Sequence, residues 1–211
     1  MPVFKSGKNL APFWCEMEYF DIVHLNPGQT HSFARVGAKE KIIVGRGRCR
    51  LAFDGEQKDV EKGDNVDLRT NEAAFEVLDV AEPTTLIRMA GRWGDDVGGS
   101  GLFPVWNDAD TTNMGDPVDY PKTTKFDNHF HDCDEYWIIF EGRGVVVSEG
   151  KRYEVEAGDC VVTGMGHHHD FPRVFETVLA VFFETTMEGR KRRGHLWNHT
   201  HGPAEPVPTR I

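Results

Sequence analysis

The feature that most constrains this chain is an internal repeat. Residues 42–47 (IIVGRG) correspond to residues 138–144 (IIFEGRG) with one residue inserted, and residues 60–64 (VEKGD) correspond to residues 155–159 (VEAGD). The two matches occur in the same order, at an offset of 95 to 96 residues. Matches that recur in this way indicate copies of one structural unit. The sequence therefore predicts two similar units in tandem.

Short apolar segments and turns run through both halves of the chain. Segments rich in Val, Ile and Phe alternate with turn signals such as Asp54-Gly55 and Glu149-Gly150, whereas helical periodicity is scarce. This pattern is typical of β-strands joined by tight turns. The 211 residues, 39% of them hydrophobic, are enough to bury a real core. We therefore expect an all-β fold.

We place the boundary between the two units where the sequence pattern typical of β-strands is interrupted. Residues 98–101 (GGSG) and the Asp, Asn and Pro residues that follow them interrupt the strands and indicate a connection. We expect an N-terminal unit at 1–93, a linker at 94–124 that can cover a pocket mouth, and the core of a second unit at 125–186. The tail, 187–211, is expected to pack on the barrel or on a neighbouring subunit, with an extended and partly disordered end.

Charge and hydropathy exclude several classes of partner. Acidic residues outnumber basic ones by 34 to 24, and the one basic cluster is residues 190–193, which argues against nucleic acid as a partner. The apolar stretches, such as 177–183, are too short to cross a bilayer, so no membrane partner is expected and the predicted location is cytoplasmic. The four cysteines form no Cys-x-x-Cys pair, which favours reduced buried thiols.

Four potential metal ligands lie close together in the second copy of the repeat. His129 and His131 are two residues apart, so on a strand both side chains point to the same side. Glu135 follows after a short break that can turn back, and His169 can close the set from a later strand. Three imidazoles and one carboxylate suit iron, manganese, nickel, copper or zinc, and they leave coordination positions open for a substrate.

These four residues, together with Gly142 and Gly158-Asp159, resemble the two signature motifs of the cupin superfamily. The resemblance covers both halves, so the whole chain is similar to a bicupin, with two tandem double-stranded β-helix (jelly-roll) barrels. By motif position, the family implies His129, His131, Glu135 and His169 as metal ligands inside the C-terminal barrel. Two residues depart from the second motif: Gly164 stands where cupins usually have Pro, and Arg173 where they often have Asn.

The N-terminal copy lacks the same ligands. Subtraction of the repeat offset places Phe33, Arg35, Lys39 and Ala74 opposite the quartet, and none of these is a plausible ligand here. A shift of one residue would bring in Glu40. We therefore predict one divalent transition metal ion per chain, in the C-terminal barrel, with the N-terminal barrel free of metal.

Three further residues are candidates for the pocket around the metal. Arg173 alternates with His169 along one expected strand, so it is predicted to face inward, where its guanidinium can hold an anion or form an internal salt bridge. His167 also has the parity to face inward, unless a turn after Gly166 changes it or the side chain is solvated. Trp137 is expected either to line the pocket or to be part of the core.

Several functions remain open at this stage. The resemblance implies a fold and a metal site, and cupins carry out many different reactions. We expect a metal-dependent enzyme with iron or manganese, or alternatively zinc or nickel, that acts on a small oxygenated and anionic molecule. Dioxygenase or decarboxylase chemistry is favoured because the sequence offers no well-placed base for isomerisation. One alternative is a sugar or sugar-phosphate isomerase or epimerase in which the metal stabilises an enediolate. Another is a non-catalytic barrel that binds a small molecule. A homodimer is the expected assembly.

Overall fold

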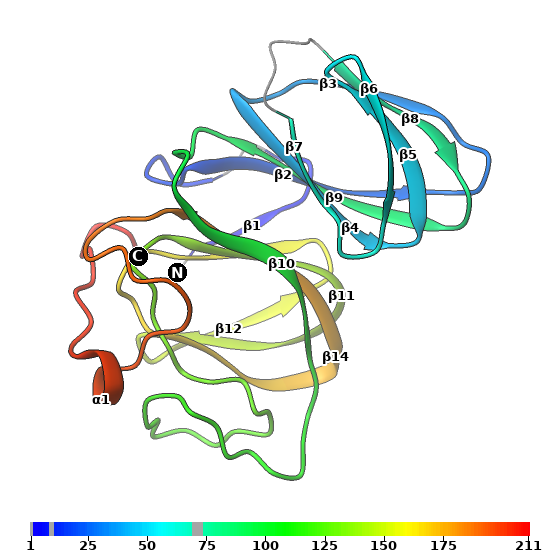
Figure 1. The fold of residues 1–211 in the computed structure, drawn as a ribbon. Coiled ribbons are helices and arrows are strands. Elements are labelled where there is room, and N and C mark those ends of the chain that lie inside the picture. The colour runs from blue at the N-terminus through cyan, green and yellow to red at the C-terminus, as the bar shows by residue number, and fades with distance from the viewer. Residues whose placement is uncertain (1, 9–10, 69–73) are drawn as a thin grey trace. The chain divides into compact units, whose positions relative to one another are not determined.

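The structure is a computed structural model that describes residues 2–8, 11–68 and 74–211, and it divides into two compact units. Ser6–Trp93 form the N-terminal unit, and Gly94–Ile211 together with Met1–Lys5 form the C-terminal unit. Both units are built of antiparallel strands, and the described residues include one short helix, α1 (Asn198–His201) (Figure 1). The all-β prediction is confirmed.

The N-terminal unit consists of two four-stranded antiparallel sheets, ordered β2-β9-β4-β7 and β3-β8-β5-β6. Their strands are β2 (Met17–Leu25), β3 (His31–Ala34), β4 (Lys39–Arg46), β5 (Arg48–Phe53), β6 (Glu56–Glu61), β7 (Asn65–Leu68), β8 (Ala74–Val80) and β9 (Thr84–Gly91). Side chains alternate between faces, so Cys49 and Leu51 of β5 are buried while Arg48 and Arg50 are exposed. The buried faces of the two sheets share one apolar core.

The C-terminal unit contains a six-stranded sheet ordered β1-β13-β11-β14-β10, with β12 paired to β11. Its strands are β1 (Val3–Lys5), β10 (Val97–Val105), β11 (Glu135–Ser148), β12 (Lys151–Glu156), β13 (Asp159–Thr163) and β14 (His169–Thr186). The long strands β11 and β14 pair along their length, with several register shifts that mark β-bulges. Buried apolar side chains from these strands form its core.

This division differs from the expected one in two places. Residues 3–5 were assigned to the N-terminal unit, yet β1 pairs with β13 of the C-terminal unit. The expected linker contains β10, whose residues 97–105 pair with β14. Its glycines suggested a loop, but Gly98 is a strand residue where a Cβ would lie 2.4 Å from the carboxylate of Glu184. A strand that passes this close to a buried side chain requires glycine.

Matching backbone hydrogen bonds define the repeat more sharply than the sequence does. The amide of Gly63 donates to the Val44 carbonyl at 2.8 Å, and that of Gly158 donates to the Ile139 carbonyl at 2.9 Å. Both pairs are related by 95 residues, without an insertion. This offset places Glu40 opposite Glu135, which corrects the assignment of Lys39 to that position.

In the N-terminal unit, Glu40 forms a buried ion pair. Its carboxylate accepts bonds from Nε and Nη2 of Arg88 at 2.9 and 2.8 Å, and Nε of Arg35 lies 3.4 Å away. The side chains of Glu40 and Arg88 are 0% and 6% exposed. The carboxylate that corresponds to Glu135 therefore has arginines as its partners. That the N-terminal unit holds no metal stays a prediction, and the metal content of the protein tests it.

The tail does not have the partly disordered end that was expected. The Val207 amide donates to the Met165 carbonyl at 3.1 Å, so the last residues are attached to the turn that precedes β14. Glycines at this turn make room for them, because a Cβ on Gly164 would lie 2.2 Å from the Arg210 carbonyl oxygen and one on Gly166 would lie 2.4 Å from that of Glu205. The departure from Pro at Gly164 thus coincides with a docked C-terminus.

Candidate metal centre

The four predicted ligands are brought together by the strands of the C-terminal unit. Glu135 is the first residue of β11 and His169 is the first residue of β14. The backbones of His129 and His169 form an antiparallel bridge, with N–O distances of 3.2 and 2.9 Å. Phe130 points away from His129 and His131 and pairs with Leu196 of the tail. The alternation expected for His129 and His131 is therefore present.

The three imidazoles converge on one carboxylate oxygen. The Nε2 atoms of His169, His131 and His129 lie 2.7, 3.2 and 3.9 Å from Oε2 of Glu135. One ligand atom from each of the four residues lies within 4.8 Å of those from the others. All four residues are buried, with exposures of 0–4%. Such a cluster of donors around one point is the geometry that a transition metal ion requires.

Hydrogen bonds at the other ring nitrogens determine which nitrogen faces the centre. Nδ1 of His129 donates to the Asp127 carbonyl at 2.8 Å, and Nδ1 of His169 donates to the His167 carbonyl at 2.9 Å. Each Nε2 is then left with a lone pair directed at the centre. Nε2 of His169 lies 2.7 Å from Oε2 of Glu135, so two electron-pair donors that can bind a metal ion are next to each other.

Two of the inward nitrogens have no partner. Nε2 of His129 and Nε2 of His131 are buried and make no hydrogen bond. A buried polar atom without a partner is costly, and native proteins usually satisfy it. A bound metal ion would satisfy both nitrogens, so the residues present fit such an ion.

Burial and charge shift the pKa values of these groups. Burial, reinforced by the neighbouring His169, lowers the pKa of His129 to about 3, so its ring is neutral and able to bind a metal. Burial also lowers the pKa of His131, but the carboxylates of Glu135 and Glu184 outweigh it and raise the pKa. Burial alone would raise the pKa of Glu135, yet the adjacent imidazoles hold it well below its usual range. Glu135 is therefore ionised, the form in which a carboxylate binds a metal.

Aromatic side chains surround the quartet. Trp137, a candidate pocket residue, is 2% exposed and its ring meets that of His169 edge-on at 5.1 Å between centroids. Phe126 lies against both Trp137, at 5.1 Å, and His129, at 5.7 Å. Trp137 thus belongs to the core and to the wall of the centre at once. Such a wall lowers the local dielectric and strengthens interactions between charges.

Arg173 does not face the centre, and this prediction is wrong. Phe171 is buried as expected, but Arg173 is exposed and its guanidinium lies 5.2 Å from the ring centroid of Phe175. The reason is a register shift, because Val145 pairs with Arg173 whereas Val147 pairs with Asp170. One extra residue on β14 inverts the alternation of side chains.

His167 also lies outside the quartet. The turn at Gly164–Gly166 breaks the strand alternation, so the side chain of His167 meets the tail. Its Nε2 donates to the Val207 carbonyl at 2.9 Å, and its Nδ1 lies 3.7 Å from the carboxylate of Glu149. Its contacts are those of a residue that fixes the tail.

Two further residues beside the centre, His195 and Glu184, were not singled out from the sequence as part of it, whereas Cys133 lies in the turn between the candidate ligands and was expected either to reach the metal or to be a buried thiol. The ring of His195 stacks on His129 with 3.8 Å between centroids and an interplanar angle of 2°. On the other side, a carboxylate oxygen of Glu184 lies 3.8 Å from Nδ1 of His131, and the buried Cys133 joins these two in a group of possible ligands. Burial and the nearby carboxylates raise the pKa of the Cys133 thiol, which keeps it protonated. The His-rich tail was the available signal in the sequence, whereas the pairing of Glu184 with Glu135 became visible only in the structure.

Acidic residues next to the ligands are bonded to the tail. These contacts are Trp197 Nε1 to Asp127 at 2.7 Å, Arg192 to Asp132 at 2.8 and 2.9 Å, and Arg210 to Asp134 at 3.0 Å. The loop that carries two of the four ligands is therefore held by residues from the last 20 or so positions of the chain. The tail therefore helps to fix the position of the candidate ligands through their neighbouring residues.

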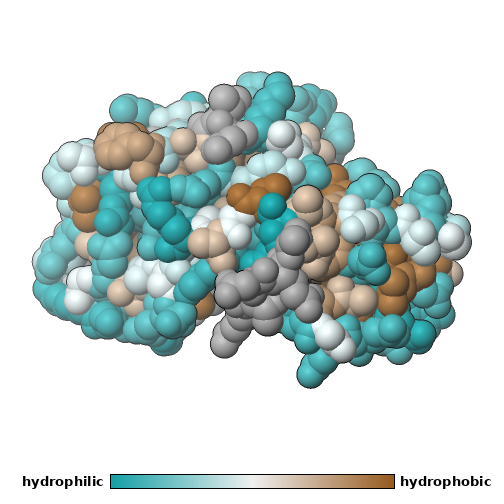
Figure 2. All heavy atoms as spheres, turned by 90° about the horizontal axis from the view of Figure 1, so that it is seen from above, coloured by the Kyte–Doolittle hydropathy of each residue, from teal (hydrophilic) through white to brown (hydrophobic). Residues whose placement is uncertain are grey.

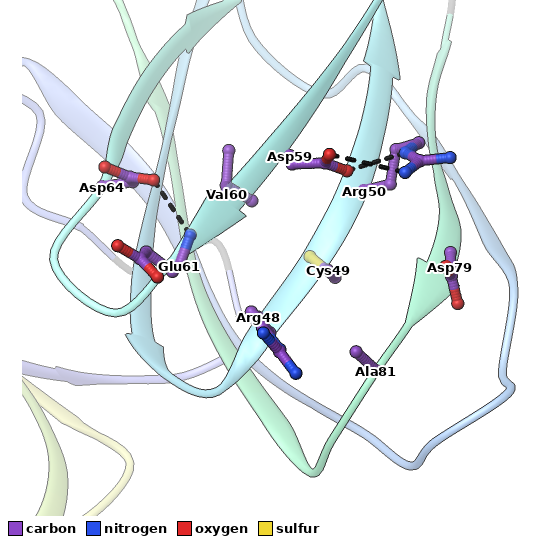
Figure 3. A pocket seen from close by; sticks show the side chains of 9 residues that line it. All are labelled: Arg48, Cys49, Arg50, Asp59, Val60, Glu61, Asp64, Asp79 and Ala81. Atoms are coloured by element: carbon purple, nitrogen blue, oxygen red, sulfur yellow. Dashed lines mark hydrogen bonds and ion pairs between the residues drawn. The ribbon is translucent and has the colours of Figure 1, made fainter.

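Figure 3 shows a pocket of about 390 Å³ in the N-terminal unit, beside β5, β6 and the end of β8. Two of its acidic groups already have hydrogen-bond partners: Asp59 accepts a bond from Arg50, and Asp64 accepts a bond from the Glu61 amide (Figure 3). The one sulfur is the thiol of Cys49, whose pKa burial raises to about 11. This pocket therefore has fewer groups that could bind a metal or react than the histidine cluster has.

The fold and the four convergent donor groups are those of a cupin, and the C-terminal unit contains a cupin domain. The family model for the cupin domain matches residues 118–183, which span all four candidate ligands. The chain is 43% identical over 212 residues to the uncharacterized protein y4oW from Sinorhizobium fredii, with 100% of this chain and 97% of that protein covered.

Solved structures share the fold at low sequence identity. Vicilin from Corylus avellana (hazelnut) superposes with a TM-score of 0.56 at 11% identity, covering 87% of this chain and 79% of vicilin. A variant of oxalate decarboxylase from Bacillus subtilis gives a TM-score of 0.51 at 10% identity, covering 79% of this chain and 68% of the other. These likenesses establish the two-barrel fold and leave the reaction open.

The surface gives no further assignment. On the face drawn in Figure 2 hydrophilic side chains predominate, and hydrophobic ones occur in small groups. Within the part of the chain that the structure describes, no helix has the length and apolar character needed to cross a membrane.

Proposed function

We propose that this cupin is a metal-dependent enzyme that binds one divalent transition metal ion per chain, iron or manganese, through His129, His131, Glu135 and His169. The convergence of three Nε2 atoms on one ionised carboxylate carries this proposal, because two of those atoms have no other partner. The reaction proposed is of the dioxygenase or decarboxylase type, on a small oxygenated substrate. A resident iron or manganese ion would supply adjacent coordination positions and a change of redox state.

The roles of the chain's own residues follow from their contacts. The backbone carbonyls of Asp127 and His167 orient two imidazoles, so that each presents a lone pair to the centre. Trp137 and Phe126 form an apolar wall that excludes water from one side. Arg173, the residue expected to hold an anionic group, is at the surface, so the proposal gives it no part in substrate binding.

A second candidate is an isomerase or epimerase, which needs a base beside the metal to move a proton. The position of His195 favours it, because its Nδ1 lies 3.0 Å from both carboxylate oxygens of Asp127 while its ring stacks on His129. An imidazole held in this way is oriented as the bases of many enzymes are.

Metal content is the first test. The wild-type protein is expected to contain about one iron or manganese ion per chain, and Glu135→Ala is expected to lose it, whereas His199→Ala, which changes an exposed histidine of α1, should retain it. Zinc or nickel in place of iron would favour the isomerase, and a wild-type protein that binds no metal under gentle purification would refute the proposal.

Oxygen consumption then separates the reactions. The iron-loaded protein is mixed with small hydroxy acids, keto acids and catechols in an oxygen electrode. Consumption that depends on both substrate and Glu135 would establish a dioxygenase. Release of carbon dioxide without net oxygen uptake would indicate a decarboxylase, and rearrangement without either would indicate an isomerase. A protein that holds metal but turns over none of these compounds would fit a non-catalytic binding barrel.

A further inference from the structure

One pocket lies beside the candidate metal centre. It has a volume of about 260 Å³ and lies at the end of β10, where its lining includes Trp106, Lys125, Phe126, Asp127 and His195. Three of these residues connect it to the quartet: Phe126 and His195 stand against the ring of His129, and the Asp127 carbonyl accepts the His129 Nδ1–H. The pocket is thus lined by residues that contact a proposed ligand, His129.

His195 separates this pocket from the centre. Its ring lies parallel to His129 at 3.8 Å and edge-on to His131 at 5.5 Å. The quartet is 0–4% exposed, whereas the side chain of His195 is 43% exposed. One face of this imidazole therefore covers a buried ligand, while its edge is open to the pocket.

The covering position of His195 is set by hydrogen bonds. Both carboxylate oxygens of Asp127 lie 3.0 Å from its Nδ1, and the Trp197 indole donates to the same carboxylate at 2.7 Å. With Nδ1 as the donor, Nε2 carries a lone pair that the carboxylate does not use. Only a rotation of one partly exposed side chain is needed to break these contacts. A ring held this way can close the centre and can also swing aside.

We infer that small ligands reach the metal centre through this pocket and contact His195 as they enter. This inference rests on the proposed metal site and deepens it, since it assigns the route and the first side chain that a substrate meets. The floor of Phe126 and the indole of Trp106, which is 51% exposed, suit a flat apolar body, and His195 offers a hydrogen-bond acceptor to a hydroxyl or acid group. The substrate class is accordingly a small hydroxylated or acidic compound with an apolar part.

Metal exchange provides a test that needs no substrate. Protein loaded with Co(II) is mixed with an excess of chelator, and the release of the metal is followed by absorbance. Removal of the cover in His195→Ala should accelerate release at least about tenfold, while the content at saturation stays at one ion per chain. His195→Gln, which removes the ring but keeps a polar side chain, should behave in the same way. His199→Ala, in the same tail, is the matched control.

A bulky label that blocks the pocket, called the plug below, tests the same route, because it should slow release instead of accelerating it. The native cysteines are all buried, so a cysteine introduced by Lys125→Cys can be labelled selectively with a bulky maleimide. Lys125 is 49% exposed and lines the pocket, so the label should slow release severalfold. The same label on Arg143→Cys, which is 56% exposed and lines a different pocket, should not.

The outcomes distinguish this inference from the proposed function. Faster release from both His195 variants together with slower release from the plugged protein is the expected result. Release at the wild-type rate from the His195 variants, or from the plugged protein, would overturn the route. A wild-type protein that binds no Co(II) at all would instead overturn the metal site.

Discussion

The metal site predicts a stability that depends on metal concentration and on Glu135. A ligand that binds only the folded state at 100 times its dissociation constant stabilises that state by about 2.7 kcal/mol. For a chain of this size each kcal/mol raises Tm by about 2–4 °C, so saturation should raise the Tm of the C-terminal unit by roughly 5–11 °C. The structure contributes the number of candidate ligands: three imidazole nitrogens and one carboxylate, all buried.

Glu135→Gln keeps the size of the side chain and removes its charge. Loss of a partner outside the ligand shell costs about 10–100-fold in affinity, so loss of the carboxylate itself should cost about 100-fold or more. At the same metal concentration the metal would then stabilise the variant by only about 0.4 kcal/mol, which raises Tm by roughly 1–2 °C. In chelator, where the carboxylate has no metal to bind, the variant and the wild type should melt within a few degrees of each other.

The assay is a thermal melt of wild type and Glu135→Gln at matched Mn(II) or Co(II) concentrations and in chelator. His199→Gln is the control, because this histidine is 50% exposed and binds Asp116 instead of the quartet. A metal-induced rise in Tm that is equally large in Glu135→Gln and in the wild type would refute the assignment of this carboxylate as a ligand.

Four further results are expected. Gly142→Ala should destabilise the protein by at least about 2 kcal/mol in denaturant melts, because φ is +79° and the added Cβ would lie 2.1 Å from a backbone oxygen of β14. Its control is Gly150→Ala, which has a similar φ of +74° but open space around the added Cβ, and which should cost only about 1 kcal/mol. Arg88→Met should cost about 3–5 kcal/mol because it leaves Glu40 buried and charged, and Arg88→Met/Glu40→Leu should recover most of that loss. Cys49, with its pKa raised to about 11, should have roughly one thiolate in a thousand at pH 8 and resist iodoacetamide in the native state, with reactivity growing as the pH approaches 11. Light scattering should give a homodimer, twice the 23.9 kDa of one chain.

Each expectation has a result that would contradict it. Equal losses of stability for Gly142→Ala and Gly150→Ala would show that β14 moves easily to make room for a Cβ at position 142. A double variant as unstable as Arg88→Met alone would mean that the lost stability came from packing of the arginine, not from the buried charge of Glu40, which then has only the more distant Arg35 as a cationic partner. Rapid alkylation of Cys49 at pH 8, measured by mass spectrometry, would show that its site opens often. A mass of one chain would rule out the dimer.

The sequence predicted those parts of the centre that depend on local spacing. His129 and His131 are two residues apart on extended backbone, so their shared orientation follows from strand geometry alone. The fold class followed in the same way from short apolar segments and the repeat. The position of His169 opposite His129 depends on a pairing between distant strands, which local spacing does not reveal. The family motif indicated it instead.

What the sequence did not reveal depends on irregular backbone and on contacts across long separations. The bulge before Arg173 inverts one strand face and leaves no mark in the residue pattern. The offset of the repeat was ambiguous by one residue until hydrogen bonds fixed it, and that residue decides between Lys39 and Glu40. His195 reaches the centre from a tail with no regular periodicity, so only the three-dimensional structure could place it on His129.

The pairing of β1 with β13 bears on how the chain folds as it is synthesised. Val3–Lys5 are synthesised before the N-terminal unit, yet their partner Asp159–Thr163 emerges only after the whole of that unit has been made. The N-terminal unit is complete at Trp93 and can fold while translation continues, whereas the C-terminal unit must retrieve the start of the chain. A fragment that begins at Gly94 would therefore lack an edge strand and expose the backbone of β13 to pairing with other molecules.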